Sequence, residues 1–217
     1  MKQIKTIIVD FDGTLVNSVR ALYKAYSHFL RLQNKKPTES EYITMNGFTA
    51  KEIVACLKTW HDLEEPFDEL FSFFKQLVQV QYKKSLLFPG VRPFLNWTKE
   101  RGIQLGIVTS SLEEWVVPIL ENEEISHYFS CIVTSDRILK GKPDPEGFLL
   151  AMNEMDANKE STVVIEDSPN GIEAAISAEL QSIQFTGGSQ LHSTHKGVIF
   201  SGGWERILSY LKKREGK

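Results

Sequence analysis

The chain opens with a short hydrophobic run and then changes its pattern. Residues 4–10 (IKTIIVD) are rich in β-branched side chains and do not alternate with polar ones, which predicts a strand buried on both faces of a parallel sheet. From about residue 19 to residue 84, apolar residues recur at steps of three and four, which predicts helices. The four predicted helices cover residues 19–33, 38–46, 49–60 and 66–84.

After residue 85, short apolar runs alternate with amphipathic stretches. The runs predict strands at 103–109, 129–136, 161–167 and 181–187. The stretches between and after them predict helices at 92–102, 112–123, 145–155, 169–179 and 203–215. Strands separated by helices of this length indicate an α/β fold, a three-layer Rossmann-like core with a parallel sheet. We expect residues 1–17 and 86–217 to form this core and residues 18–85 to form an inserted helical cap.

Local signals place some of the helix ends. Thr38 and Thr49 are each followed three residues later by a glutamate, Glu41 and Glu52, which predicts a capping box at both helix starts. Pro66 suits the first turn of the next helix.

Composition narrows the function classes. Of 217 residues, 41% are apolar and 24% are charged, which is ordinary for a globular chain, and the net charge of -3 offers no overall attraction for nucleic acid or an anionic membrane. Cys56 and Cys131 lack metal-ligand spacing and are expected to be small buried hydrophobic residues. The first apolar run is too short for a signal peptide and no run could span a membrane, so we expect a cytoplasmic protein.

Polar residues stand at four places where the predicted core does not need them. They are Asp10 and Asp12, Thr109 with Ser110 and Ser111, Lys142, and Glu166 with Asp167. Because ligands of open parallel sheets bind outside the carboxyl ends of the strands, we expect these groups to converge on one crevice.

The chemistry of these groups predicts a phosphoryl site. Several carboxylates in one pocket repel one another unless a cation joins them, and oxygen-only ligation favours Mg²⁺. Lys142 adds positive charge, and Thr109 with the amide after it adds hydrogen-bond donors. One of the two aspartates Asp10 and Asp12 would attack phosphorus, and the other would serve as general acid and then base.

At these residues the chain resembles the haloacid dehalogenase (HAD) superfamily of phosphohydrolases. The segments DFDGT, IVTSS, KPDP and VIEDSPNG resemble its four motifs in order and spacing, over nearly the whole chain. The helical insert after the first motif resembles the type-1 cap of the phosphoglycolate phosphatase and β-phosphoglucomutase-like branch. Asn17 departs from the aspartate that this branch often has there, which changes a cap-hinge position.

The resemblance implies a role for each matched residue. Asp10 would be the nucleophile that forms an aspartyl-phosphate, and also a Mg²⁺ ligand. Asp12 would protonate the leaving oxygen and then activate water, with its backbone carbonyl on the metal. Asp167 would bind Mg²⁺, with Glu166 as a direct or water-mediated ligand. Thr109 and Ser110 would hold the phosphoryl oxygens. Lys142 would bridge the phosphoryl group and Asp10.

Substrate contacts are expected from the cap and the loop that follows the fourth motif. The segment NGFTAKEI resembles the one that lies over the substrate in this branch. The candidate substrate residues are Gly47, Lys51 and Asn170, with Arg20, Lys58 and His61 as further cap candidates. Charged residues on a helix usually lie on its solvated face, which is the simpler interpretation of these cationic residues. The aromatic residues of the cap are expected to form its core; they are Trp60, Phe71, Phe73 and Phe74.

Each motif by itself also fits a structural role. The TSS segment could cap the helix that starts near residue 112, the GKPDP segment could be a surface loop with a solvated Lys142, and EDSPNG could be a helix cap. Four such coincidences together are improbable, so the catalytic interpretation is preferred.

The sequence therefore predicts a Mg²⁺-dependent phosphatase of a small phosphorylated metabolite, a monomer or weak dimer without nucleic-acid or membrane partners. Three alternatives stay open at this point: a sugar phosphomutase, a non-catalytic HAD-like binding protein, and a phosphonate-cleaving enzyme that uses a cap lysine. The substrate itself is chosen by cap loops and is not named by the motifs.

Overall fold

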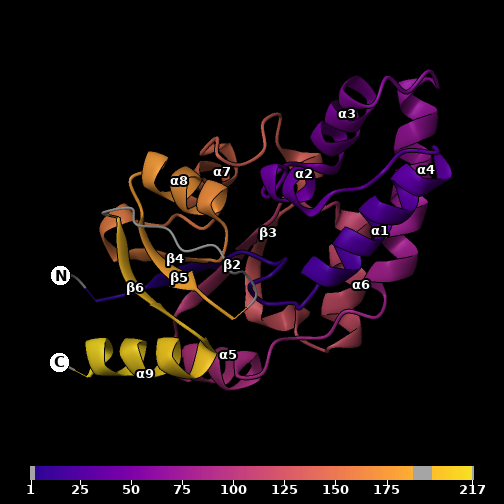
Figure 1. Cartoon of the computed structure of the whole chain (residues 1–217). Helices are drawn as coiled ribbons and strands as arrows, with labels where there is room; N and C mark the ends of the chain where they lie inside the picture. Colours follow the sequence, from indigo (N-terminus) through magenta and orange to yellow (C-terminus); the bar gives the residue numbers. More distant parts are fainter. Residues whose placement is uncertain (1–2, 188–196, 217) are drawn as a thin grey trace.

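The computed structural model describes residues 3–187 and 197–216, and within them six strands form one parallel sheet (Figure 1). The strands are β1 (Thr6–Val9), β2 (Gln104–Val108), β3 (Phe129–Val133), β4 (Thr162–Glu166), β5 (Gln181–Phe185) and β6 (Val198–Gly202). Their order is β3-β2-β1-β4-β5-β6, which is the doubly wound Rossmann order. The predicted fold class is confirmed.

Strand β1 lies in the middle of the sheet because both of its faces are apolar. Ile7 and Val9 belong to one hydrophobic core and Ile8 belongs to another, as the two-residue period of a strand requires. The edge strands β3 and β6 are partly exposed, whereas β1 and β4 are fully buried. The β1 and β4 ends are therefore the most enclosed ends of the sheet.

Helices cover both faces and make the three layers. Helices α5 (Val91–Glu100), α6 (Glu113–Asn122) and α9 (Trp204–Glu215) supply buried residues to the core that Ile7 and Val9 enter. Helices α7 (Glu146–Glu154) and α8 (Pro169–Ser177) supply the core on the Ile8 side. Short 3-10 helices, η1 (Ser126–Tyr128), η2 (Ser135–Arg137) and η3 (Lys159–Ser161), precede or follow strands β3 and β4.

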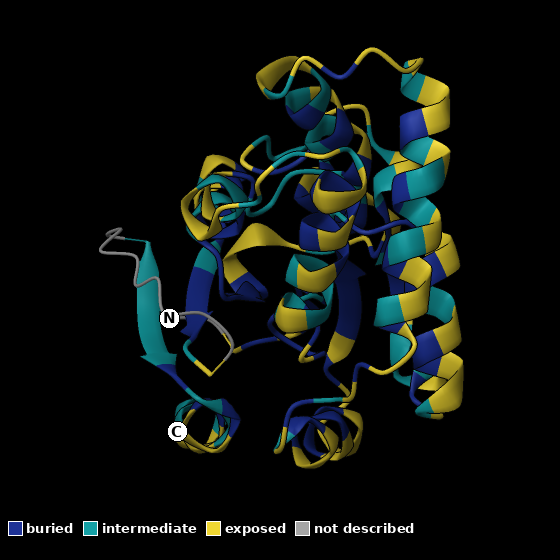
Figure 2. Ribbon diagram, turned by 45° about the vertical axis from the view of Figure 1, so that its right-hand side comes forward, coloured by how far each residue is buried: buried dark blue, intermediate teal, exposed yellow. Residues whose placement is uncertain are grey.

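A separate group of helices stands beside the sheet (Figures 1 and 2). It contains α1 (Val19–Leu32), α2 (Glu39–Thr44), α3 (Ala50–Trp60) and α4 (Phe67–Tyr82). Two linkers join it to the core, and they lie side by side: the Asn17 amide donates to the Leu86 carbonyl at 2.9 Å, and Val16 bridges Leu87 in antiparallel fashion. The predicted boundaries at 17/18 and 85/86 fall within this paired linker, and we keep residues 18–85 as the proposed cap.

Every strand and helix expected from the sequence is present, with ends displaced by a few residues, and β6 is an addition. Strand β6 was missed because it is an edge strand with three apolar residues followed by serine and glycine, and its pairing with β5 defines it. Within the described residues, no helix combines the length and the apolar character that crossing a bilayer requires.

The capping box predicted at Thr49 forms. The Thr49 hydroxyl accepts the Glu52 amide at 3.3 Å, and the Thr49 amide donates to the Glu52 carboxylate at 2.7 Å. Pro66 is the residue before α4 rather than part of its first turn.

The capping box predicted at Thr38 is wrong. The Thr38 hydroxyl does accept the Glu41 amide, at 3.2 Å, but the Glu41 side chain does not return to Thr38. It accepts instead from the Tyr26 hydroxyl at 2.5 Å and from His61 at 2.9 Å, because α1 and the end of α3 bring these groups within reach. The Thr38 amide donates to Tyr26.

Two residues expected to be buried are not. Trp60, expected in the cap core, is 47% exposed at the end of α3, whose buried residues are Ala50, Val54 and Leu57. Phe74 is buried as expected, while Phe71 and Phe73 are partly buried. Cys56 is only half-buried, and both cysteines are free thiols.

Candidate active site

Three carboxylates meet where the strand order of the sheet reverses. Asp10 follows β1, while Glu166 ends β4 and Asp167 follows it. Each of the three is at most 5% exposed, and they offer ligand atoms that all lie within 4.8 Å of one another. The sheet therefore brings together residues that are more than 150 positions apart in the sequence.

Lys142 is part of this cluster and is not a solvated loop residue. Its side chain is 5% exposed, and its ammonium donates to Asp10 Oδ1 at 2.5 Å and to Glu166 Oε1 at 2.7 Å. A third bond, of 3.2 Å, goes to the Val108 carbonyl at the end of β2. The surface-loop interpretation of the GKPDP segment is thus wrong, because a buried ammonium needs these partners.

The cluster has an excess of negative charge. Burial raises the pKa of Asp10 to about 8, with Glu166 and Asp12 adding to the rise and Lys142 opposing it. Burial, then the charges of Glu166 and Asp10, raise the pKa of Asp167 well above its ordinary value. Asp10 Oδ2 is buried and has no hydrogen-bond partner within the described residues. Three buried carboxylates that share one ammonium form an all-oxygen donor set, which fits a hard divalent cation such as Mg²⁺.

Metal binding should therefore change the pH dependence of stability. A carboxyl group whose pKa is higher in the folded than in the unfolded chain stabilises the fold below its unfolded pKa, 3.8 for Asp10, and this contribution is lost as pH rises through about 8. We expect the melting temperature in EDTA to fall between about pH 5 and about pH 8. Mg²⁺ at about 100 times its Kd should raise the free energy of unfolding by about 2.7 kcal/mol. This corresponds to a rise of about 5–10 °C in the melting temperature, and the rise should be larger at the higher pH.

Thermal unfolding with EDTA or Mg²⁺ at the two pH values, with NaCl matched for ionic strength, measures this effect. An equal Mg²⁺ shift at both pH values would contradict the charge balance described for the cluster.

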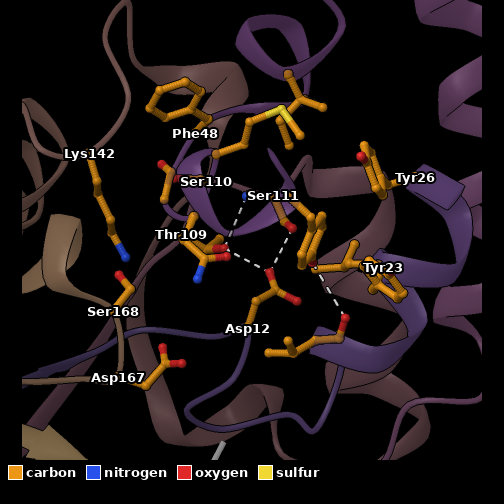
Figure 3. Close-up of a pocket in the computed structure, with 18 of the residues that line it drawn as sticks. Asp12, Tyr23, Tyr26, Phe48, Thr109, Ser110, Ser111, Lys142, Asp167 and Ser168 are labelled. Carbon is orange, nitrogen blue, oxygen red and sulfur yellow. Dashed lines mark hydrogen bonds between the residues drawn. The ribbon is translucent and has the colours of Figure 1, made fainter. Parts of the chain in front are cut away.

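Asp12 points to a different set of partners. Its Oδ2 accepts from the hydroxyls of Ser111 at 2.7 Å and Thr109 at 3.3 Å (Figure 3). Its Oδ1 accepts from the hydroxyls of Ser18, in the cap linker, and Tyr82, in the last turn of α4. Burial and the charge of Asp12 raise the pKa of Tyr82 well above its ordinary value, so this hydroxyl remains a donor.

Ser18 and Tyr82 were missed by the sequence analysis. Ser18 lies six residues after Asp12 in the first motif region, but Tyr82 lies 70 residues away. In sequence it is one more apolar position of an amphipathic helix, and only the packing of α4 against the core places its hydroxyl on Asp12.

The second motif divides its hydroxyls between two tasks. Thr109 is 1% exposed, and its hydroxyl accepts the Ser111 amide at 3.1 Å. The Ser110 hydroxyl, predicted to hold a phosphoryl oxygen, donates to the Gly47 carbonyl at 2.5 Å. The helix-cap interpretation of TSS is wrong, because Leu112 precedes α6 without a side-chain cap.

Gly47 and Asn170 meet where the cap loop touches the core. The Asn170 amide donates to the Asn46 carbonyl at 2.6 Å. A Cβ on Gly47, whose φ is +91°, would lie 2.9 Å from the Asn170 Cβ, so the close approach requires glycine. With the Ser110 bond, this contact joins residues 46–47 to two core loops and closes the cap over the cluster.

The fourth motif serves both structure and site. Ser168 caps the N-terminus of helix α8 by accepting the Gly171 amide at 3.1 Å. The interpretation of EDSPNG as a helix cap is therefore confirmed. The Ser168 amide donates to Glu166 Oε2 at 2.6 Å. A Cβ on Gly171 would lie 1.7 Å from Glu166 Oε1, so this position must be glycine if Glu166 is to face Lys142.

The cationic cap residues that were expected to contact substrate lie in different places. Lys58 donates to the carbonyls of Leu63 and Glu65, both at 2.6 Å, and closes the end of α3. His61 pairs with Glu41. Lys51 is exposed and does not line the pocket, whereas Arg20 does, at the first turn of α1.

A cavity of about 620 Å³ contains the cluster and extends under the cap. Its core wall includes Asp10, Asp12, Thr109, Lys142 and Asp167, and its cap wall comes from α1, α2, α3 and α4. This volume suits a small-molecule ligand that is largely enclosed.

The sequence is similar to those of known proteins. The family model described as "Haloacid dehalogenase-like hydrolase" matches residues 7–185. A relative from Thermotoga maritima, named phosphorylated carbohydrates phosphatase, is 30% identical over 97% of this chain and 99% of its own length. A phosphoglycolate phosphatase from Nitrosospira multiformis is 31% identical over 81% of this chain and 80% of its own.

A solved structure shows the same fold. The crystal structure of β-phosphoglucomutase from Clostridium difficile matches with a TM-score of 0.82 at 19% identity, covering 99% of this chain and 100% of that one. At this level of identity the likeness concerns the fold.

Proposed function

The chain belongs to the haloacid dehalogenase-like hydrolase family, and on that premise we propose that it is a Mg²⁺-dependent phosphatase of a small phosphorylated metabolite. The observation that carries this proposal is the buried cluster of Asp10, Glu166 and Asp167 with Lys142, in which Asp10 Oδ2 has no partner within the described residues. A carboxylate oxygen that is enclosed and unpartnered is suited to attack phosphorus.

The first half-reaction transfers the phosphoryl group to Asp10. An electron pair of Oδ2 forms the new bond to phosphorus, and the bond from phosphorus to the substrate's ester oxygen breaks. Asp12 gives its proton to that oxygen, so the organic product leaves as an alcohol. Lys142, which bonds Asp10, and Thr109, which bonds Asp12, would hold the oxygens of the transferred phosphoryl group.

The second half-reaction releases phosphate. Asp12, now ionised, takes a proton from a water molecule, whose oxygen attacks phosphorus while the bond to Asp10 Oδ2 breaks. The Ser18, Tyr82 and Ser111 hydroxyls hold the carboxylate of Asp12 in the structure, so they would set its direction between the two steps.

The metal would be held by Asp10, Asp167 and the backbone carbonyl of Asp12, with Glu166 as a direct or water-mediated ligand. When bound, Mg²⁺ neutralises the charge of the phosphoryl group and of the carboxylates. Residues 18–85 would act as the cap, and opening at the paired linker would admit substrate and release product.

The direct test is phosphate release from p-nitrophenyl phosphate. We expect turnover with Mg²⁺ and none with excess EDTA. Absence of turnover with Mg²⁺, Mn²⁺ and Co²⁺ for this ester and for a panel of alkyl phosphates would reject the phosphatase and favour a binding protein.

Asp12→Asn should separate the acid role from the nucleophilic role. The variant cannot protonate a leaving oxygen, so we expect kcat to fall about 10²–10⁴-fold for an alkyl phosphate. The loss should be smaller for p-nitrophenyl phosphate, because that leaving group needs little protonation. Equal losses for both esters would show that Asp12 does not act as the acid.

A sugar phosphomutase would use the same core, so it stays the alternative activity. Incubation with glucose 1-phosphate distinguishes the two, since a mutase forms glucose 6-phosphate and a phosphatase forms glucose and inorganic phosphate. The apolar cap wall of the cavity favours hydrolysis of a less polar ester.

A further inference from the structure

The part of the cavity under the cap is lined by aromatic and aliphatic side chains, which we call the aromatic chamber. It consists of Tyr23, Tyr26, Tyr42, Phe48, Ile53 and Phe74. Figure 3 shows Tyr23 and Tyr26 on one side of the cavity and Phe48 on another, above Asp12 and Thr109. Aromatic surface lies next to the place where the leaving group of a phosphate ester would be.

The three tyrosines form one packed cluster. Their ring centroids are 5.8 Å (Tyr23 and Tyr26), 5.4 Å (Tyr26 and Tyr42) and 5.2 Å (Tyr23 and Tyr42) apart. The Tyr26 hydroxyl bonds Thr38 and Glu41, and the Tyr42 hydroxyl donates to the Val19 carbonyl at 3.4 Å. Tyr26 is 1% exposed and Phe74 is 3% exposed, so these two rings support the chamber from behind. Its accessible wall is formed by partly buried side chains, Tyr23, Tyr42, Phe48 and Ile53, and the engaged hydroxyl of Tyr42 leaves mainly ring surface for a ligand.

Charge in the cavity is arranged for one anionic group only. Lys142 belongs to the phosphoryl end of the cavity, where it pairs with Asp10 and Glu166, and it does not serve the chamber. Among the described lining residues, the one other basic side chain is the exposed Arg20, and the exposed Glu39 also lines the cavity. A second anionic group deep in the chamber would meet rings and aliphatic carbon, where its desolvation would not be compensated.

We propose that the substrate is a phosphate monoester of an uncharged alcohol with an aromatic or bulky apolar body, which packs in the aromatic chamber. The chamber favours this body over a short carboxylate-bearing alcohol, which would not fill it. It also favours this body over a polyhydroxylated sugar, whose hydroxyls would meet rings and aliphatic carbon in the chamber and could find side-chain partners only at the polar part of the lining, such as Asn17, Asn46 and Glu39. This inference rests on the proposed function for its phosphoryl end, while its apolar end rests on the chamber alone.

Three esters of primary alcohols test the substrate class: 2-phenylethyl phosphate, ethyl phosphate and phosphoglycolate. Burial of the phenyl group predicts a kcat/KM about 10- to 100-fold higher for 2-phenylethyl phosphate than for the other two. A kcat/KM for either small ester equal to or above that of 2-phenylethyl phosphate would overturn the inference and leave the phosphatase intact.

Binding without turnover separates the two proposals. With Mg²⁺ present, calorimetry should find 2-phenylethylphosphonate bound about tenfold or more tightly than ethylphosphonate. If no phosphate ester is hydrolysed but this preference is found, the phosphatase fails and the apolar site stands. If the two phosphonates bind equally, the apolar site fails whatever the turnover.

Variants place the preference in the chamber. Phe48→Ala and Ile43→Ser should each lower the ratio of kcat/KM between the phenyl and ethyl esters. Ile43 also lines the cavity and is 41% exposed, so its replacement tests the site without endangering the fold. Trp60→Ala is the matched control, a cap aromatic outside the cavity lining, and should leave the ratio unchanged. A ratio unchanged by both Phe48→Ala and Ile43→Ser would overturn the assignment.

Discussion

Asp10→Asn is expected to abolish phosphate release, with kcat lowered by at least about 10⁴-fold, while the protein stays folded. The amide has no electron pair of comparable nucleophilicity to form the bond to phosphorus that Oδ2 would form. The fold should persist because the change removes one of three buried carboxylates in mutual repulsion and keeps an oxygen that can accept from Lys142.

The measurement is kcat at saturating Mg²⁺ and substrate, with the melting temperature in EDTA as the second readout. Removing a repelling charge should leave that temperature unchanged or raise it at about pH 8. Asp62→Asn, the same substitution at an exposed position, is the control and should retain full activity. Mass spectrometry excludes reversion of asparagine to aspartate. Residual kcat above about one hundredth of the wild-type value would reject Asp10 as the nucleophile.

Lys142→Met should damage both stability and activity. Methionine keeps the apolar stem that lies among buried residues, but it leaves Asp10 and Glu166 without the ammonium that now bonds both. Breaking a buried ion pair from one side costs about 3–5 kcal/mol, so we expect the melting temperature in EDTA to fall by roughly 6–20 °C. Loss of a cation beside the phosphoryl group should lower kcat about 10²–10³-fold.

Magnesium separates these two effects. It should return part of the lost stability to Lys142→Met, because it neutralises the same carboxylates, but it should not return the activity. Lys159→Met provides the control, since Lys159 forms an exposed pair with Glu179, and such pairs contribute at most about 1 kcal/mol. A melting temperature unchanged by Lys142→Met in EDTA would mean that the ammonium does not hold the cluster together.

Much of the site is predictable because parallel strands direct their carboxyl ends to one edge. Asp10, Glu166 and Asp167 each follow or end a strand that reads as a buried apolar run, so a correct assignment of β1 and β4 brings them together. The burial of Lys142 was harder to predict, because no feature of the neighbouring sequence distinguishes a buried lysine from a solvated one. Its burial follows from its ion pairs with Asp10 and Glu166, both distant in sequence.

The partners of Asp12 and the roles of the cap residues were beyond reach of the sequence. Tyr82 and Trp60 both read as apolar positions of cap helices, yet one bonds the proposed acid and the other is half exposed. Gly47 and Asn170 were expected at the substrate, and the structure places them in the contact that joins cap and core. Whether they also touch substrate stays a prediction.

The sequence by itself determined the type and order of the main elements, the parallel sheet and the strand-end acids, because hydrophobic period and turn residues act over a few neighbouring positions. Tertiary structure alone decided which side chains share a hydrogen bond or a cavity: Glu41 with Tyr26 rather than Thr38, Tyr82 with Asp12, and the tyrosines of α1 with that of α2. Such contacts depend on how helices pack, which is set by the summed shapes of many residues, and no short stretch of sequence encodes that sum.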